Sequence, residues 1–263
     1  MTGTSRAPLL VLDWGIGGFG VVRALWRRDP TLSIVYVSDA GFTPYGKVPT
    51  RALAARLGVL LAYFAGLGAE RAVLACNAAS TVAHLLPATS LEVLDMLDAG
   101  VEVVLRTGLS RVGLLGGGRT VRSGHHRRRL AARDVTVRGR VAQPLSAWVE
   151  RGELGSAALE ADVARVVAPL RGERAVLLAC THYPAIEGVL QRHLPGVELL
   201  DPAEALAERV CPIEPPMVGA QRAAARRIRA FTTGSPEATR AGAKAAFGLD
   251  PGPVATLTFA RRS

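Results

Sequence analysis

Two cysteines stand at matching positions along the chain. Cys76 ends the apolar run of residues 72–76, and Cys180 directly follows the similar run of residues 176–179. Polar residues that could begin a helix come after each one. The positive end of a helix dipole lowers the pKa of a thiol, which ordinarily lies near ~8.5. Both thiols are therefore candidate acid–base groups at neutral pH.

The spacing of these cysteines indicates a tandem duplication. Cys76 and Cys180 are 104 positions apart, and Asp13 and Gly116, which end two other apolar runs, are 103 apart. Nearly equal offsets predict one repeated unit with a cleft between its two copies. Two thiols facing each other across that cleft could remove a proton from one face of a carbon and deliver one to the other. Cys211 has no counterpart, so we expect it to be structural.

Two further residues could assist the thiols. His182 lies two positions after Cys180, and Asp13 ends the strand expected beside that of Cys76. Either side chain could accept a proton from its thiol or return one. A helix-capping role for His182 is the alternative.

A glycine loop supports a competing hypothesis. Residues 15–20 match G-x-G-x-x-G after an apolar run, and Asp39 lies 19 positions beyond Gly20, as in dinucleotide-binding proteins. Asp13 argues against this, because it would place a carboxylate beside a pyrophosphate. General anion binding or a tight turn would also require the glycines. A thiol–disulfide enzyme is disfavoured because there is no C-x-x-C, and the five histidines have no zinc-ligand spacing.

The elements that must position these residues alternate between strands and helices. The expected strands are residues 9–13, 33–39, 72–76, 111–115, 135–138, 175–179 and 256–259, the last returning to the first half. The expected helices are residues 21–28, 50–66, 78–86, 120–133, 157–170, 185–193, 202–210, 221–231 and 237–247. This alternation predicts parallel β-α-β units, whose ligands bind beyond the carboxyl ends of the strands.

Composition limits the class of protein. The 263 residues are 49% hydrophobic and 21% charged, which is typical of a globular protein, and three cysteines exclude a disulfide-stapled scaffold. The net charge is +10, but only two of the 32 basic residues are lysines. We interpret this charge as a solvated surface; nucleic acid, an acidic partner or an anionic substrate are the alternatives. The apolar window of residues 57–69 is shorter than the ~20 residues of a membrane span, so we expect a cytoplasmic protein.

Six segments, taken in order, resemble motifs of the glutamate racemases within the aspartate/glutamate racemase superfamily. They are residues 13–18, 44–46, 76–80, 116–124, 180–184 and 231–237. The resemblance implies an α/β fold of two pseudo-symmetric, flavodoxin-like lobes with parallel sheets and an active-site cleft between them. Residues 1–97 and 205–263 would form the first lobe, and residues 98–204 the second.

The resemblance also implies a reaction: racemisation by two bases, without a cofactor or a metal. The implied catalytic residues are Cys76, Cys180, Asp13, His182 and Glu150. The implied substrate-binding positions are Trp14, Pro44, Tyr45, Gly46, Asn77, Ala78, Thr120 and Thr181. Members of the family usually supply D-glutamate to peptidoglycan and form homodimers. Some also bind DNA gyrase, and the basic surface keeps that role open, so a non-catalytic racemase-like binding protein is an alternative; nucleic acid is not expected.

Two departures from the family pattern fall within the implied site. Trp14 replaces a serine, and Ala78 replaces a threonine. Each replacement removes a hydroxyl, and a lost hydrogen bond to a charged group costs about 1.5–3 kcal/mol. The departures predict retained proton chemistry on a less acidic or bulkier substrate. If Trp14 turned away from the cleft, glutamate could still fit.

Overall fold

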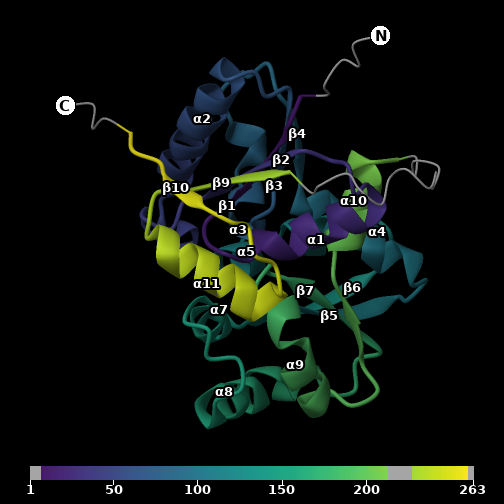
Figure 1. Ribbon diagram of the computed structural model, residues 1–263. Coiled ribbons are helices and arrows are strands. Elements are labelled where there is room, and N and C mark those ends of the chain that lie inside the picture. The colour runs from purple at the N-terminus through teal and green to yellow at the C-terminus, as the bar shows by residue number, and fades with distance from the viewer. Residues whose placement is uncertain (1–6, 213–226, 260–263) are drawn as a thin grey trace, which may run out of the picture.

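The computed structural model describes residues 7–212 and 227–259, which form two parallel sheets with helices around them (Figure 1). The strands are β1 (Leu9–Asp13), β2 (Ile34–Ser38), β3 (Arg71–Leu74), β4 (Glu92–Asp95), β5 (Arg111–Gly116), β6 (Thr136–Val141), β7 (Ala175–Ala179), β8 (Glu198–Leu200), β9 (Ile228–Thr232) and β10 (Val254–Thr256). The α-helices are α1 (Gly18–Arg28), α2 (Thr50–Gly66), α3 (Asn77–Ser80), α4 (Met96–Arg106), α5 (Gly118–Ser123), α6 (His125–Ala131), α7 (Gln143–Glu150), α8 (Ala157–Val167), α9 (Glu187–His193), α10 (Ala203–Val210) and α11 (Pro236–Phe247). Short 3-10 helices occur at η1 (Tyr45–Lys47), η2 (Ala83–Leu85), η3 (Ala168–Leu170) and η4 (Tyr183–Ile186).

The two sheets repeat one strand order. The first sheet runs β10-β9-β2-β1-β3-β4, and the second runs β6-β5-β7-β8. Every pair of neighbouring strands is parallel, from β1 with β2 to β7 with β8. The segment β2-β1-β3-β4 therefore corresponds to β6-β5-β7-β8, as expected of a duplicated unit. The predicted α/β class with parallel sheets is confirmed; the division at residues 97 and 205 stays a prediction.

Strand β1 is buried on both faces of the first sheet, which explains its unbroken apolar sequence. Leu9 and Val11 join the core cluster that contains α1 and α11, whereas Leu10 and Leu12 join the cluster beneath α2. These helices lie on opposite sides of the sheet (Figure 1). The two faces together hold the carboxyl end of β1 in a fixed position.

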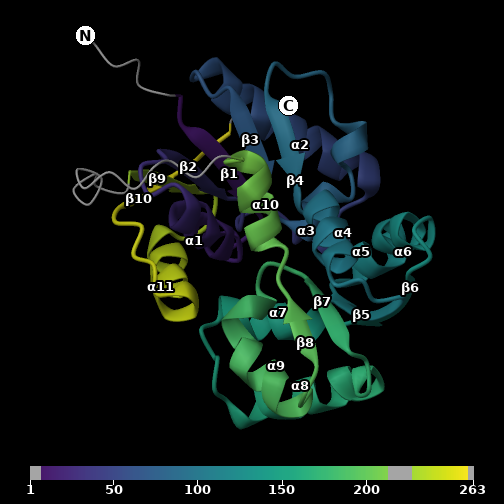
Figure 2. The same ribbon diagram turned by 90° about the vertical axis from the view of Figure 1, so that its right-hand side faces the viewer.

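One apolar core runs through both halves of the molecule. It includes Leu25 of α1, Leu206 of α10, Val163 of α8 and Leu178 of β7. Helix α10 packs between α1 and α4, above the second sheet (Figure 2). Because the halves share this core, the carboxyl ends of the two sheets are held facing one another.

Three predicted helices differ from the structure. Residues 78–86 form only the end of α3 and the separate η2. Residues 120–133 break at Gly124, whose φ of 65° ends α5 before α6 begins. The predicted helix at 221–231 is wrong over Ile228–Thr232, which is strand β9, and its first part lies outside the described residues. Strand β10 does return to the first sheet, at Val254–Thr256 rather than 256–259.

His126 is a buried polar residue of α6 that predicts a pH-dependent stability. It is 2% exposed, and neither ring nitrogen has a hydrogen-bond partner within the described chain. Burial lowers its pKa to about 3, and the charges of His125 and Arg129 act in the same direction. The unfolded chain therefore binds a proton below pH ~6.5 that the folded chain does not bind. Proton binding by the unfolded chain therefore lowers the free energy of unfolding progressively as the pH falls from about 6.5 to the pKa of His126 in the folded protein.

Replacing His126 by leucine should remove this contribution. Between pH 7.5 and 5.5 we expect the wild type to lose about 1.4 kcal/mol more unfolding free energy than His126→Leu. Urea denaturation of both proteins at the two pH values measures the difference. An equal loss in both proteins would show that His126 titrates normally in the folded state.

Candidate active site

A pocket with about 570 Å³ of empty space, part of it open to solvent, lies where the two sheets face each other. Its walls are the segments that follow β1, β3, β5 and β7, together with η1 and the first turn of α7. All four strands are parallel within their sheets and end at this pocket. The location agrees with the general rule that ligands bind beyond the carboxyl ends of parallel strands.

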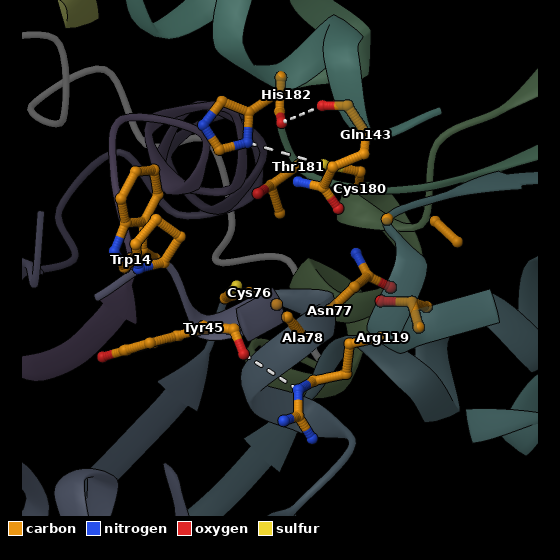
Figure 3. Close-up of a pocket in the computed structure, with 16 residues that line it drawn as sticks. Trp14, Tyr45, Cys76, Asn77, Ala78, Arg119, Gln143, Cys180, Thr181 and His182 are labelled. Carbon is orange, nitrogen blue, oxygen red and sulfur yellow. Dashed lines mark hydrogen bonds between the residues drawn. The ribbon is translucent and has the colours of Figure 1, made fainter. Parts of the chain in front are cut away.

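Cys76 and Cys180 line this pocket from opposite sheets. Cys76 lies between β3 and α3, and Cys180 lies between β7 and η4. Both thiols are half-buried, and Figure 3 shows them on opposite sides of the open space. The structure thus places the two cysteines on opposite sides of one pocket, as their equivalent sequence positions predicted.

The surroundings of Cys76 favour its protonated form. Burial raises the pKa of this thiol well above its ordinary value, and the charges of Asp13 and Cys180 raise it further. The backbone N–H groups of Ala79 and Ala78 lower the pKa but only partly offset these effects. The following helix therefore acts in the expected direction, but the expected net lowering of the Cys76 pKa is wrong, because desolvation outweighs the effect of one helical turn.

Cys180 begins a chain of hydrogen-bonding groups. Its Sγ lies 3.6 Å from Nδ1 of His182, and Nε2 of His182 pairs with Oε1 of Glu150. Burial lowers the pKa of His182, but the hydrogen bonds to Cys180 and Glu150 outweigh burial and raise it well above the ordinary value. For Glu150 burial has the opposite effect and raises the pKa. The hydrogen bond and charge of His182, with the N–H of Ile16, outweigh burial and bring the pKa of Glu150 below its ordinary value. A carboxylate and an imidazolium therefore stand behind Cys180.

Asp13 connects the two halves beneath the pocket. Its carboxylate is fully buried and accepts hydrogen bonds from the amides of Trp14 and Gly15. The Thr181 hydroxyl, which belongs to the second half, donates to the other carboxylate oxygen at 3.0 Å. Asp13 and Thr181 thus hold each other in place.

Trp14 faces the pocket rather than turning away from it. Its Nε1 donates to the carbonyl of Phe42 at 3.0 Å, so the indole offers a ligand its ring and not its N–H (Figure 3). Ala78 lines the same pocket and has no hydroxyl. Both departures from the family pattern therefore make the walls less polar.

The remaining predicted binding residues also reach the pocket. Thr120 is buried at its wall, and Tyr45, with Pro44 and Gly46, contributes a second segment. Asn77 is 2% exposed, and within the described residues neither its Oδ1 nor its Nδ2 has a partner. Asn77 therefore brings two polar atoms that lack a partner in the described chain to the wall of the pocket.

Asp39 is engaged in a buried ion pair and is not available to a ribose. Arg56 binds its two oxygens at 2.9 and 2.6 Å, and the hydroxyls of Tyr45 and Thr233 donate to it at 2.8 and 2.9 Å. Removing one partner of such a buried pair typically costs about 3–5 kcal/mol. The acidic residue on which the dinucleotide hypothesis relied therefore has a structural role.

The glycine loop also has a structural explanation. A Cβ on Gly15 would lie 1.9 Å from Oε1 of Glu150, and a Cβ on Gly17 would lie 2.4 Å from Oγ1 of Thr181. Both distances are shorter than any real contact, so a side chain at either position would push Glu150 or Thr181 out of its place. Close packing between the halves therefore explains these two glycines, and a role in binding a phosphate group is not needed to explain them.

Five residues that line the pocket are not among the predicted site positions: Gly117, Arg119, Gln143, Ser146 and Ala179. Arg119 reaches across the cleft, where its Nε donates to the carbonyl of Tyr45 at 3.0 Å and its Nη2 to that of Val48. It directly follows the glycines at the end of β5, which could have marked it. No sequence pattern predicted α7, on which Gln143 lies.

Residues 7–212 and 227–259 contain neither a candidate metal site nor a candidate membrane span. No cluster of three or more histidine, cysteine, aspartate or glutamate side chains there could hold a metal ion. The helices in the same ranges are too short or too polar to cross a membrane.

Comparison with known proteins agrees with this geometry. The family model for Asp/Glu/Hydantoin racemase matches residues 21–210. The glutamate racemase of Desulforudis audaxviator is 30% identical over 274 residues, covering 98% of this chain and 100% of that protein. The glutamate racemase of Stutzerimonas stutzeri is 34% identical over 217 residues, covering 78% of this chain and 80% of that protein.

Solved structures show the same fold. The glutamate racemase of Thermus thermophilus in complex with β-chloro-D-alanine superposes with a TM-score of 0.81 at 27% identity, covering 96% of this chain and 97% of that one. The glutamate racemase of Francisella tularensis in complex with D-glutamate gives a TM-score of 0.84 at 20% identity, covering 96% of this chain and 98% of that one. Together with the family match and the two-sheet architecture, these likenesses establish that the chain belongs to the Asp/Glu/Hydantoin racemase family.

Proposed function

We propose that this protein is an amino-acid racemase that uses Cys76 and Cys180 as its two acid–base groups and needs no cofactor. The observation that carries the proposal is the position of the two thiols, which end equivalent strands and line one pocket from opposite sides. Two proton-transfer groups on opposite faces of a carbon are what inversion of a stereocentre requires.

The raised pKa of Cys76 assigns this thiol the acid role in one direction of the reaction. Cys76 rests as the thiol, because its pKa is raised, and therefore acts as the acid. Cys180 removes the α-proton from the opposite face, and the C–H electron pair passes to the α-carbon and its carboxylate. The Cys76 S–H then forms the new C–H bond, which leaves Cys76 as the thiolate and Cys180 as the thiol. The other enantiomer reacts through the reverse sequence.

Neighbouring groups support each thiol in this scheme. His182, kept protonated by Glu150, lies 3.6 Å from Cys180 Sγ and can hydrogen-bond to that sulfur or exchange a proton with it. Asp13 lies close enough to Cys76 for its charge to raise the pKa of that thiol. A negative charge beside Cys76 also makes its thiolate a stronger base once it has formed.

Glutamate is the leading substrate, because the full-length relatives are glutamate racemases. The amide of Asn77, the hydroxyl of Thr120 and the backbone at Tyr45 and Gly46 would bind its carboxylates. The indole of Trp14 supports a second candidate, an amino acid with a less acidic or bulkier side chain. A homodimer, a cytoplasmic location and a role in peptidoglycan synthesis stay predictions from the resemblance.

Exchange of the α-proton in D₂O tests the proposal. We expect the purified protein to replace the α-proton of both L- and D-glutamate by deuterium, measured by proton NMR, and to yield both enantiomers from either one. The panel includes other L- and D-amino acids. Exchange with a different amino acid alone would favour the redirected substrate, and no exchange with any of them would contradict amino-acid racemisation.

A further inference from the structure

Gln143 is a pocket residue to which nothing above assigns a role. It is the first residue of α7, and its side-chain amide points into the cavity between Thr181 and Asn77 (Figure 3). Its Oε1 accepts a hydrogen bond from the backbone N–H of Gly118 at 3.1 Å. Its Nε2 has no hydrogen-bond partner in the described part of the chain.

The bond to Gly118 determines which way the amide faces. Only the oxygen of a glutamine amide can accept that N–H, so Nε2 and its two hydrogens are turned toward the cavity. The group lies close to two glycines of different segments: a Cβ on Gly117 would lie 3.4 Å from Oε1, and a Cβ on Gly46 would lie 3.7 Å from it, both ordinary contact distances. The amide therefore sits where the two halves meet, with its donor exposed to a ligand.

Several other side-chain N–H groups of the pocket already have protein partners. The indole of Trp14 donates to the Phe42 carbonyl, and the guanidinium of Arg119 donates to the carbonyls of Tyr45 and Val48. His182 is engaged with Cys180 and Glu150. The side-chain amides left for a ligand are those of Asn77, from the first half, and Gln143, from the second.

The charges of the pocket indicate which end of a substrate meets Gln143. Asp13 and Glu150 hydrogen-bond to the backbone at Trp14 and Ile16, so their negative charge lies behind the pocket wall at the β1 loop and favours a positive α-ammonium group on that side. Gln143 lies instead against Gly46 and the loop after β5. A substrate held between the thiols with its ammonium near Asp13 would direct its side chain toward that loop.

We propose that Gln143 is a specificity-determining residue whose Nε2 donates a hydrogen bond to a carbonyl oxygen at the distal end of the substrate side chain. Gln143 would thereby select amino acids with a side-chain carboxylate or carboxamide over apolar ones of equal length. This inference rests on the proposed racemase function. A distal carboxylate and a distal carboxamide both present the required oxygen, and the experiment distinguishes them.

The variant Gln143→Glu tests the donor without disturbing the loop. It keeps an oxygen for the Gly118 N–H and replaces the Nε2 donor by a second, negatively charged oxygen. With glutamate, we expect kcat/KM to fall by about tenfold or more, mainly through KM, because a charged hydrogen bond is lost and two carboxylates repel. With glutamine, whose own NH₂ can donate to the new oxygen, the fall should stay within about threefold.

Norvaline is the matched control, because it has the same side-chain length without a distal polar group. Gln143→Glu should lower the rate of α-proton exchange of norvaline less than that of glutamate; an equal fall for both amino acids would show a general disturbance of the pocket and overturn the role of Gln143. If the wild type exchanges α-protons but the glutamate-to-glutamine ratio of kcat/KM does not change in the variant, the role of Gln143 is overturned and the racemase function stands. If the wild type exchanges no amino acid, the racemase function fails and the role of Gln143 fails with it.

Discussion

Replacing either Cys76 or Cys180 by alanine should abolish racemisation, with kcat lower by about 10³-fold. One correctly positioned proton-transfer group contributes typically 10²–10⁴-fold, and the remaining thiol cannot reach the opposite face of the α-carbon. A variant with a single thiol can still remove the proton on its own side. Circular dichroism, which follows conversion of one enantiomer into the other, measures the loss.

The two variants should differ in which enantiomer still exchanges its α-proton. Cys76→Ala keeps the base on one face and Cys180→Ala keeps the base on the other, so each should retain slow deuterium exchange with opposite enantiomers. Cys211→Ala is the matched control: Cys211 is buried at the end of α10, outside the pocket, and its loss should leave the rate unchanged. Racemisation at the wild-type rate by either active-site variant would contradict the two-thiol mechanism.

Glu150→Gln should lower kcat by about 10²-fold, the second-largest effect, and narrow the pH range of activity. The carboxylate of Glu150 helps to raise the pKa of His182, so the imidazole stays protonated above its ordinary pKa in the wild type. The amide keeps an oxygen for the N–H of Ile16 but carries no charge. In the variant His182 should lose its proton at a lower pH. The alkaline limb of the pH profile of kcat should then move to lower pH. Once His182 has lost its proton, it can no longer donate a hydrogen bond or a proton to Cys180.

Kinetics and NMR test this effect independently. The pH dependence of kcat gives the position of the alkaline limb, and the ring proton signals of His182 report its protonation directly. Glu153→Gln is the control, because Glu153 pairs with Arg151 at the exposed end of α7 and does not line the pocket. An unchanged alkaline limb in Glu150→Gln would show that Glu150 does not control the protonation of His182.

Local sequence patterns were sufficient to locate most of the catalytic candidates. Asp13, Cys76 and Cys180 could be found because each stands at the end of an apolar run, and strand ends of parallel sheets form ligand sites. The equal offsets between the repeats then paired the cysteines, and the repeated strand order agrees with that pairing. These features depend on neighbouring residues and on sequence spacing, which are visible without coordinates.

The errors have two causes: strand pairing with distant residues, and a helix break at a single glycine. Residues 228–232 have a helix-compatible pattern, yet they pair with β2 and β10 as strand β9. The predicted helix at 120–133 is divided at Gly124, whose positive φ ends one helix and starts another in a different direction. Sheet pairing depends on partners that a local pattern does not contain.

The sequence by itself determined the α/β class, the duplicated strand ends and the two thiols, because apolar runs and their spacing encode local backbone structure. Only the tertiary structure decided the chemical state of those thiols and what surrounds them. Desolvation raises the pKa of Cys76, Trp14 lines the pocket, and the amide of Gln143 faces a ligand from a helix that no pattern predicted. Each of these properties depends on which atoms exclude water or meet across the cleft, and those atoms come from segments far apart in the chain.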